Sequence, residues 1–566
     1  MFEFDILSNA ADAALDLLKA QDGVFEYRFT CKAGGEEITL VTRTECVNCF
    51  TVWNPSIDFD RQLRPEWYSS KCPSSVLKGI PCHCITGQDG NNALTIAASD
   101  CKNRMEIKTG VHEEDATMTC KIVICVPCKK EEMYETILRF DTRVIPYYDS
   151  IYSVSDWWTS LGYTCAEVPD SAKLPMYSSW YSFHQMLSHD EIISECILAK
   201  ELGMDTIILD DGWQTEDVAR GYAYCGDWES AFSKVGNMNE LTDKIHSMGM
   251  KIMLWYNIAF MGEHAKMCDE FKGMYIGDKV RGRYTLDPRY LKVREYLTDL
   301  FANAVRKWNL DGLKIDFVDS FIRSEDDVIT DGMDCPVLED AVENLFCSIK
   351  QVLTEINPDI MIEFRQNYMG AVMRKYANVF RVMDCPDDSL RNRVGVVNLR
   401  LMSADYAVHS DMLMWNMAES ESVAAKQIIN VLFSVPQISV RIEKLSEPHY
   451  KMLRFYLSFW IKYRDLFVNQ KMIPLSPEAN FSKVYSENTD TKMCVCYSDN
   501  TIAVGDKKKT VVVNGTSQNI FFADVICDCT CTIYNCMGEV VYKADFEKGL
   551  SKIEIPVSAV AEFDLR

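Results

Sequence analysis

The sequence predicts an α/β fold, a (β/α)8 TIM barrel flanked by N-terminal and C-terminal β-sandwich domains. The chain has 566 residues, more than one compact domain usually holds, and about two or three domains are expected. Strand-like and helix-like segments alternate from about residue 170 to residue 465, whereas short β-runs fill both ends. We therefore expect an N-terminal β-sandwich at 1–150, a (β/α)8 barrel at 151–468 and a C-terminal β-sandwich at 469–566.

The two terminal parts show the alternation of apolar and polar residues that is typical of a sheet with one wet face. The clearest N-terminal β-runs are residues 26–31, 38–43 and 117–125. The clearest C-terminal β-runs are residues 492–497, 510–514, 531–534 and 552–555. A structural or docking role is the default for such domains, and neither carries a recognisable catalytic motif.

The central part offers one candidate strand for each of the eight positions of a barrel. These strands are residues 175–180, 206–210, 251–256, 312–317, 360–364, 379–383, 406–409 and 437–441. Helix-period segments at 190–202, 301–310 and 420–432 separate some of them. A doubly wound open sheet is the alternative fold, and it is disfavoured because no glycine-rich phosphate turn follows the first strand.

Charge and composition restrict the partners. With 59 basic and 83 acidic residues the net charge is −24, which argues against nucleic acid or an anionic membrane surface and favours a neutral ligand. The N-terminus has no basic segment followed by an apolar run, and no apolar stretch of about 20 residues occurs. The 23 cysteines then indicate reduced thiols, so a cytoplasmic location is expected.

Three cysteine pairs have the spacing of half zinc sites: Cys46 with Cys49, Cys82 with Cys84, and Cys125 with Cys128. Their surroundings are strand-like and apolar, where cysteine is a common buried residue. We therefore predict no structural metal at these cysteines.

Acidic residues mark the ends of five candidate strands, the place where barrel active sites form. They are Asp210 and Asp211 after strand two, Asp316 at strand four, Glu363 in strand five, Asp384 after strand six and Asp411 after strand seven. Lys314 lies two residues before Asp316 and so points to the same side of its strand, where it would keep the carboxylate ionised. A structural ion pair in the core is the alternative interpretation of that lysine and aspartate.

Aromatic residues follow the same strand ends, namely Trp180, Trp213 and Trp255. A single tryptophan is more often part of a core than a ligand platform. Flat apolar rings beside carboxylates and a lysine, however, suit a sugar with its apolar face and its rim of hydroxyls.

Two carboxylates beside a carbohydrate pocket are the minimum for glycoside hydrolysis. Asp316 is the better nucleophile because of Lys314. Asp384 is the better acid/base, a role that needs a raised pKa, although Arg381 would lower that pKa if it pointed inward. Asp387 or Asp388 replaces Asp384 if the loop register differs.

Ordered motifs across the barrel resemble those of the glycoside hydrolase family 36 α-galactosidases, in the clan that also holds family 27. The matching segments are Ser179-Trp180, Asp210-Asp211-Gly212-Trp213, Asp311-Gly-Leu-Lys314-Ile-Asp316 and Arg381-Val-Met-Asp384. The resemblance implies an exo-acting α-galactosidase of small α-galactosides that retains anomeric configuration, without metal or cofactor. It also implies that Asp210 and Asp211 hold the sugar's 4- and 6-hydroxyls, that Lys314 contacts ring hydroxyls, and that Asp316 and Asp384 are nucleophile and acid/base.

Two departures from the family pattern fall on substrate contacts. Strand three ends in Leu254-Trp-Tyr-Asn257 where many members have an acidic Glu-Pro motif. Strand five has Glu363-Phe-Arg-Gln-Asn367 where many members have Glu-Asn-Cys and glycines near the sugar's 2-position. The sugar and its C2 substituent therefore stay open, as do leaving group, substrate length, transglycosylation and a homo-oligomeric state. An α-N-acetylgalactosaminidase, another α-glycosidase, a galactosyl transferase and a non-catalytic sugar-binding barrel are the alternatives.

Overall fold

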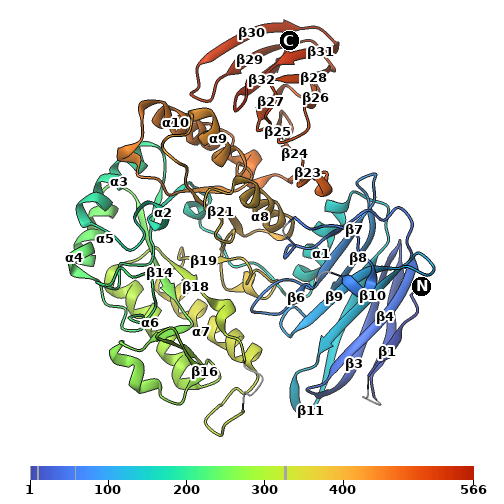
Figure 1. Ribbon diagram of the computed structural model, residues 1–566, viewed down its shortest axis with the longest axis vertical. Helices are drawn as coiled ribbons and strands as arrows, with labels where there is room; N and C mark the ends of the chain where they lie inside the picture. The colour runs from blue at the N-terminus through green and yellow to red at the C-terminus, as the bar shows by residue number, and fades with distance from the viewer. Residues whose placement is uncertain (1, 9–11, 58, 70, 324–327) are drawn as a thin grey trace.

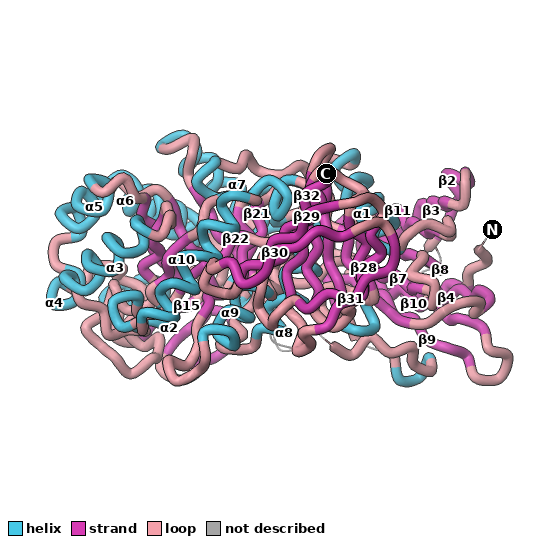
Figure 2. The backbone as a smooth tube through the Cα atoms, turned by 90° about the horizontal axis from the view of Figure 1, so that it is seen from above, coloured by secondary structure: helices cyan, strands magenta, loops and turns pink. Residues whose placement is uncertain are grey.

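The computed structural model describes residues 2–8, 12–57, 59–69, 71–323 and 328–566. Its elements form two N-terminal sheets, a closed eight-stranded barrel with a small inserted sheet, and two C-terminal sheets (Figure 1). Seen from above, helices gather at the barrel end of the molecule and strands at the N-terminal end (Figure 2). The domain boundaries at 150 and 468 remain predictions.

The N-terminal sheets face each other across a core that contains Phe29, Leu40, Ile96 and Ile122, all fully buried. One sheet has the strand order β1-β4-β10-β9-β6 and the other β2-β3-β11-β8-β7-β5. Their bounds are β1 Asp5–Leu7, β2 Ala14–Gln21, β3 Val24–Gly34, β4 Glu37–Glu45, β5 Thr51–Trp53, β6 Pro73–Ser74, β7 Cys82–Thr86, β8 Asn92–Ala98, β9 Met105–His112, β10 Thr117–Cys125 and β11 Cys128–Asp141.

The barrel strands are parallel and close because the last of them pairs with the first. They are β12 Met176–Ser178, β13 Thr206–Leu209, β14 Lys251–Asn257, β18 Gly312–Asp316, β19 Met361–Arg365, β20 Val379–Arg381, β21 Ala407–Leu413 and β22 Val435–Ile438. The predicted fold class is thus confirmed, and each of the eight candidate strands corresponds to one of these. The bounds differ most at the last two strands. β21 continues through Asp411 instead of ending before it, and β22 both begins and ends earlier than expected, at Val435 and Ile438.

Helices surround the barrel and join its strands (Figure 1). They are α1 Tyr147–Ser160, α2 Trp180–Phe183, α3 His189–Glu201, α4 Phe232–Val235, α5 Met238–Ser247, α6 Leu291–Trp308, α7 Leu338–Ile356, α8 Ser389–Met402, α9 Glu421–Ile429 and α10 Glu447–Lys462. An inserted antiparallel sheet after β14 consists of β15 Phe260–Gly262, β16 Tyr275–Val280 and β17 Arg283–Leu286.

The Asp311-Gly312 step fixes the start of the fourth barrel strand. Asp311 accepts hydrogen bonds from the backbone N–H of Ile252 at 2.9 Å and pairs with His246 at 2.8 Å, so it ties β18 to its neighbour β14. A Cβ on Gly312 would lie 2.7 Å from the carbonyl oxygen of Met361, so a larger residue would push β18 away from β19. These two residues place Lys314 and Asp316 at a fixed height in the barrel.

The C-terminal part has a seven-stranded sheet in the order β23-β24-β25-β27-β32-β29-β30 and a three-stranded sheet β26-β28-β31. Its strands are β23 Ile473–Leu475, β24 Lys483–Glu487, β25 Thr491–Cys496, β26 Thr501–Val504, β27 Lys509–Asn514, β28 Ile520–Val525, β29 Cys529–Tyr534, β30 Val540–Phe546, β31 Gly549–Glu554 and β32 Val560–Leu565. It packs on the barrel helix α10, where the Tyr456 hydroxyl donates to the Ser558 carbonyl at 2.7 Å.

The N-terminal sheets reach the carboxyl end of the barrel. The backbone N–H of Gly79 donates to the carbonyl of Asn367, in the turn after β19, at 2.8 Å. The buried indole of Trp53 donates to the Asn398 side chain on α8 at 3.0 Å. Within the described ranges, none of the helices combines the length and the apolar character that crossing a membrane requires.

Candidate active site

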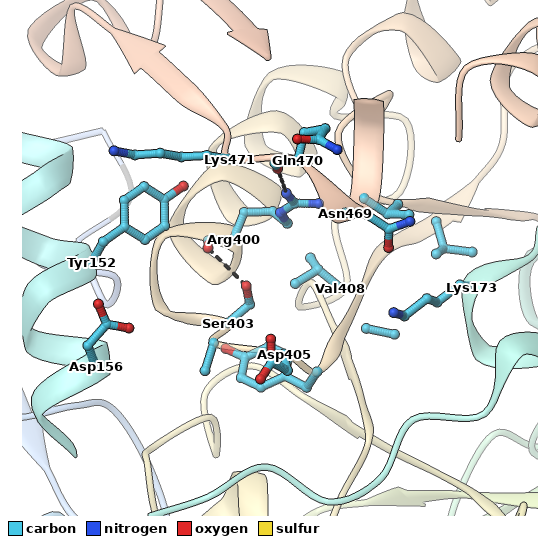
Figure 3. A pocket seen from close by; sticks show the side chains of 15 residues that line it. Tyr152, Asp156, Lys173, Arg400, Ser403, Asp405, Val408, Asn469, Gln470 and Lys471 are labelled. Atoms are coloured by element: carbon cyan, nitrogen blue, oxygen red, sulfur yellow. Dashed lines mark hydrogen bonds between the residues drawn. The ribbon is translucent and has the colours of Figure 1, made fainter. Parts of the chain in front are cut away.

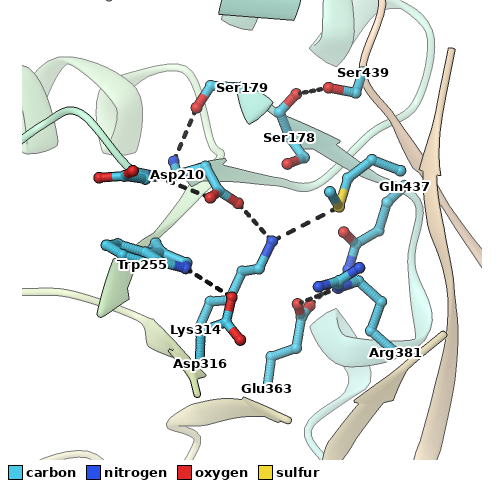
Figure 4. Close-up of polar contacts among 12 residues, drawn as sticks. Ser178, Ser179, Asp210, Trp255, Lys314, Asp316, Glu363, Arg381, Gln437 and Ser439 are labelled. Carbon is cyan, nitrogen blue, oxygen red and sulfur yellow. Dashed lines mark hydrogen bonds and ion pairs between the residues drawn. The ribbon is translucent and has the colours of Figure 1, made fainter. Parts of the chain in front are cut away.

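An ion pair joins Lys314 on strand four to Asp210, directly after strand two (Figure 4). The Lys314 ammonium is 2.5 Å from Oδ2 of Asp210, and both side chains are almost fully buried. The Asp210 backbone N–H is held by the Ser179 hydroxyl at 2.9 Å. Burial raises the pKa of Asp210, and Lys314 opposes that rise.

Asp316 ends β18 and is held from two sides. Its Oδ1 accepts from Arg365 Nε at 2.6 Å and from its neighbour's backbone N–H, that of Phe317, at 2.7 Å. Its Oδ2 accepts from the indole of Trp255 at 3.2 Å. Burial raises the pKa of Asp316, but Arg365, with help from more distant cations including Lys314, lowers it below the ordinary value.

The main cation beside Asp316 is therefore Arg365, and the expected role of Lys314 as that partner is corrected. Lys314 faces the carboxylate of Asp210 instead. The sequence did carry a signal for Arg365: it lies two residues after Glu363 on strand five, so both side chains point to the same side of the strand.

Arg381 is the hub of a second buried cluster. Its Nη1 donates to Asp411 at 2.6 Å and to Asp384 at 2.8 Å, and its Nε lies 3.3 Å from Glu363. Glu363 also accepts from the Gln437 amide at 2.6 Å. One guanidinium thus joins strand six to carboxylates from strands five and seven, as Figure 4 shows for Glu363.

Asp384 lies at the outer edge of this cluster, with its side chain 50% exposed. Burial of its carboxyl group raises the pKa, but Arg381, Lys314 and Arg365 together lower it to about 2. The raised pKa that an acid needs is therefore not found, because Arg381 points inward at Asp384.

Asp387 and Asp388, the alternatives to Asp384, are committed elsewhere. Asp388 caps α8 by accepting from the backbone N–H of Arg391 at 2.9 Å. Asp387 accepts from the Gln427 amide of α9 at 2.9 Å. Within the part of the chain that the structure describes, neither forms a hydrogen bond with Arg381, whereas Asp384 does.

Asp211 and Asp411 are more deeply placed than a rim position implies. Asp211 accepts from Gln185 and Gln214, each at 2.7 Å, and burial raises its pKa to about 6. Asp411 lies inside β21, fully buried, and accepts from the Tyr181 hydroxyl at 3.0 Å as well as from Arg381. Asp411 therefore holds the Arg381 guanidinium in place. Its expected position after the seventh strand is corrected, because it lies within that strand.

The three tryptophans occupy different environments. Trp180 is half-buried at the start of α2, edge-on to His184 at 4.9 Å. Trp255 is 2% exposed and touches Asp316 through its indole nitrogen. Trp213 is fully buried, 5.3 Å from the Tyr256 ring, so the expectation that it is a sugar platform is corrected: it belongs to the core.

Asn367 is half-buried, and its carbonyl is used by the N-terminal sheets through Gly79. Sequence reasoning missed Gln185, Gln214, Gln437 and Tyr181 as well as Arg365. Neutral amides and hydroxyls on separate elements leave no pattern that would mark them beforehand.

A different cavity, of about 460 Å³, lies at the amino ends of β21 and β22 (Figure 3). There Arg400 donates to the carbonyls of Phe467 and Gln470, at 2.6 and 2.9 Å, and so holds that chain segment. This cavity lies at the opposite end of the barrel strands from Asp316 and Asp384. Among the described residues, no three histidine, cysteine or acidic side chains are grouped in a way that could hold a metal ion.

Residues 171–363 match the Melibiase family model. The resemblance to the family 36 α-galactosidases that the motifs predict is thereby confirmed.

Two curated relatives match shorter stretches. The bifunctional α-galactosidase/sucrose kinase of Mediterraneibacter gnavus is 27% identical over 96 residues, 16% of this chain and 10% of that protein. The α-galactosidase Mel36A of Lactobacillus acidophilus is 24% identical over 159 residues, 26% of this chain and 20% of that protein. The chain therefore aligns with a fifth or less of the length of these relatives.

Solved structures of α-galactosidases share the fold of this chain. The enzyme of Lactobacillus brevis superposes with a TM-score of 0.65 at 13% identity, covering 100% of this chain and 85% of that one. The family 36 enzyme of Geobacillus stearothermophilus in complex with raffinose gives 0.62 at 13%, covering 96% and 79%. The enzyme of Thermus thermophilus, in complex with p-nitrophenyl α-D-galactopyranoside, gives 0.55 at 13%, covering 86% and 97%. At this identity the structures establish the fold.

Proposed function

We propose that this protein is a retaining, exo-acting α-glycoside hydrolase, an α-galactosidase of small α-galactosides. The observation that carries the proposal is the state of Asp316: a buried carboxylate at the carboxyl end of β18, kept ionised by Arg365 and lying close enough to Asp384 for the two charges to interact. An ionised, fixed carboxylate beside a second, more exposed one is the equipment for double displacement.

The two carboxylates take different roles. Asp316 attacks the anomeric carbon and forms a glycosyl ester as the bond to the leaving oxygen breaks, and that oxygen takes a proton from Asp384. Water then attacks the same carbon, gives a proton to Asp384 and releases Asp316 as a carboxylate. The low pKa of Asp384 means that this carboxylate is ionised, as the base of the second step must be, but also that it is a weak base. For the first step, a bound sugar must exclude water from Asp384 and so raise its pKa.

The remaining residues would hold the sugar. Asp210 and Lys314 present an acceptor and a donor at the centre of the mouth, and Trp180 supplies a partly exposed ring. The preference for galactose rests on the motif resemblance and on the galactosides named for the solved relatives. Asp411, Glu363 and Arg381 hold Asp384 in place from behind.

A second candidate is an α-N-acetylgalactosaminidase. A cavity of about 130 Å³ lies between Asn367 and residues Pro55 and Ser56, in the turn after β5. Such space beside strand five would receive a substituent larger than a hydroxyl at the sugar's 2-position. A cytoplasmic location, a homo-oligomeric state and transfer to sugar acceptors stay predictions.

The test is a panel of p-nitrophenyl glycosides assayed with the wild type and with Asp316→Asn. The α-galactoside should be hydrolysed fastest, and the variant should lose at least about 1,000-fold in kcat/KM. Faster hydrolysis of the α-N-acetylgalactosaminide would favour the second candidate. Galactose binding with no turnover of any glycoside would instead identify a sugar-binding barrel.

A further inference from the structure

The two oxygens of Asp316 are in unequal surroundings. Oδ1 accepts two short bonds, from Arg365 Nε at 2.6 Å and from the Phe317 N–H at 2.7 Å, and a longer one from the Tyr368 hydroxyl at 3.4 Å. Oδ2 has a single, longer bond, from the Trp255 indole at 3.2 Å. A carboxylate fixed in this way can rotate little, and its Oδ2 keeps lone pairs that no described protein donor saturates.

Arg365 is itself fixed in position. Its Nη1 donates to the carbonyl of Gln366 at 2.7 Å, and its two Nη atoms each lie 3.4 Å from an oxygen of Asp319. Its guanidinium carbon lies 5.5 Å from the centre of the Phe317 ring. Arg365 is therefore held between two carboxylates, and its side chain is only 13% exposed.

We propose, on the basis of the proposed function, that Arg365 is a positioning residue that holds Oδ1 of Asp316 and so makes Oδ2 the oxygen that attacks the anomeric carbon. Asp319 keeps the guanidinium aligned. Arg365 acts through Asp316 and needs no contact of its own with the sugar.

The charge changes of the reaction give this arrangement a kinetic consequence. When Oδ2 bonds to the anomeric carbon, Oδ1 becomes the carbonyl oxygen of a neutral ester, and the attraction to Arg365 weakens. When water later cleaves the Oδ2–carbon bond, the electron pair returns to the carboxylate and the attraction is restored. Arg365 thus favours the carboxylate over the ester and should speed the second step relative to the first.

Arg365 also sets the pH range of the nucleophile. Without it, the carboxyl group of Asp316 stays buried but loses its nearest cation, and its pKa rises. The acid limb of kcat/KM, which reports the free enzyme, should then move to higher pH. If the ion pair were merely structural, its loss would change the stability of the fold. The acid limb of kcat/KM and the relative rates of the two steps would stay the same.

The experiment compares Arg365→Gln, Arg365→Lys and Asp319→Asn with the wild type on 2,4-dinitrophenyl α-galactoside. The acid limb should move up by about one pH unit or more in Arg365→Gln, and less in Arg365→Lys, which keeps the charge. The fraction of covalent glycosyl-enzyme, measured by rapid quenching and intact mass, should increase in Arg365→Gln. The matched control is Lys375→Gln, which removes an ion pair away from the site, that of Lys375 with Glu343 at 2.7 Å. This variant should behave as the wild type.

A folded Arg365→Gln variant with the wild-type acid limb and no added covalent intermediate would overturn the proposal. If that variant does not fold, the proposal is tested with Arg365→Lys and Asp319→Asn, again by the pH of the acid limb and by the fraction of covalent intermediate. If the wild type is active and Asp316→Asn is inactive, the proposed function stands, even when the Arg365 variants contradict the role of Arg365. If no glycoside is hydrolysed, binding of a galactose-configured iminosugar, followed by calorimetry against pH, reports the ionisation of Asp316, and an unchanged pH dependence in Arg365→Gln refutes the role of Arg365.

Discussion

Lys314 Nζ lies 2.5 Å from Asp210 Oδ2, although Asp316 follows Lys314 by only two residues on the same strand. The pair joins strand four to the turn after strand two, and both side chains are only 4% exposed. Removal of one partner from a buried pair leaves an uncompensated charge, which usually costs more than the pair contributes.

Lys314→Met should therefore destabilise the fold by about 3–5 kcal/mol at pH 7, measured by urea unfolding. Burial already raises the pKa of Asp210, and loss of the lysine would raise it further. A carboxyl whose folded pKa exceeds its unfolded value of about 3.9 stabilises the fold at low pH and loses that contribution as pH rises through the folded pKa. The deficit of the variant should thus shrink from pH 7 towards pH 5. A Lys375→Met control, at a partly exposed pair, should cost about 1 kcal/mol or less, and equal costs would contradict the prediction.

Asp211 should be needed as an acceptor of two hydrogen bonds. Gln185 and Gln214 direct their NH₂ groups at it, while the oxygen of each glutamine accepts a backbone N–H and fixes the amide. In Asp211→Asn, the new NH₂ group would face the NH₂ group of one of these glutamines. We therefore expect thermal unfolding at pH 7.5 to show a free energy of unfolding lower by about 1–3 kcal/mol. Asp243→Asn, on the exposed side of α5, is the control, and a variant at 211 as stable as that control would show that the glutamines can turn.

Asp384→Asn should slow hydrolysis according to the leaving group. For an α-galactoside with a sugar leaving group we expect a loss of about 100- to 10,000-fold in kcat/KM, and a much smaller one for 2,4-dinitrophenyl α-galactoside, whose phenolate needs no proton. Asp387→Asn and Asp388→Asn keep their local hydrogen bonds and should retain the wild-type rate on both substrates. If either control lost activity while Asp384→Asn retained it, the acid/base role would be assigned to Asp387 or Asp388 instead.

Trp180 and Trp213 should respond in opposite ways to alanine. Trp213→Ala removes a fully buried ring and should destabilise by about 3–5 kcal/mol. Trp180→Ala removes a half-buried ring at the mouth and should raise KM about tenfold while the melting temperature changes little. Parallel melting curves and initial rates distinguish these outcomes. An unchanged KM in Trp180→Ala would exclude this ring as a sugar platform.

The barrel could be predicted because its determinants are local in the chain. Short apolar runs recur between helix-period segments, and Gly312 marks a place where two strands come too close for a side chain. The strand assignments depend on this pattern alone, and the eight strands differ from expectation mainly in their ends. The motif around Asp316 could be located for the same reason.

The electrostatic details could not be predicted because they depend on which side chains face each other across strands. The partner of Lys314 lies 104 residues earlier in the chain, and that of Asp316 lies 49 residues later. The low pKa of Asp384 depends on the inward direction of Arg381, which spacing does not reveal. Trp213 follows a strand end as a rim residue would, yet its ring turns back against Tyr256.

The hydrogen bond from Gly79 to the Asn367 carbonyl makes the N-terminal sheets part of the wall beside strand five. Variation in the loop that carries Gly79 can therefore reshape the surroundings of the turn after strand five, which the family resemblance places near the sugar's 2-position, while every barrel residue stays the same. Selection for a new substrate, in nature or in the laboratory, has a route here that lies outside the barrel. Libraries confined to the barrel would leave that route unexplored.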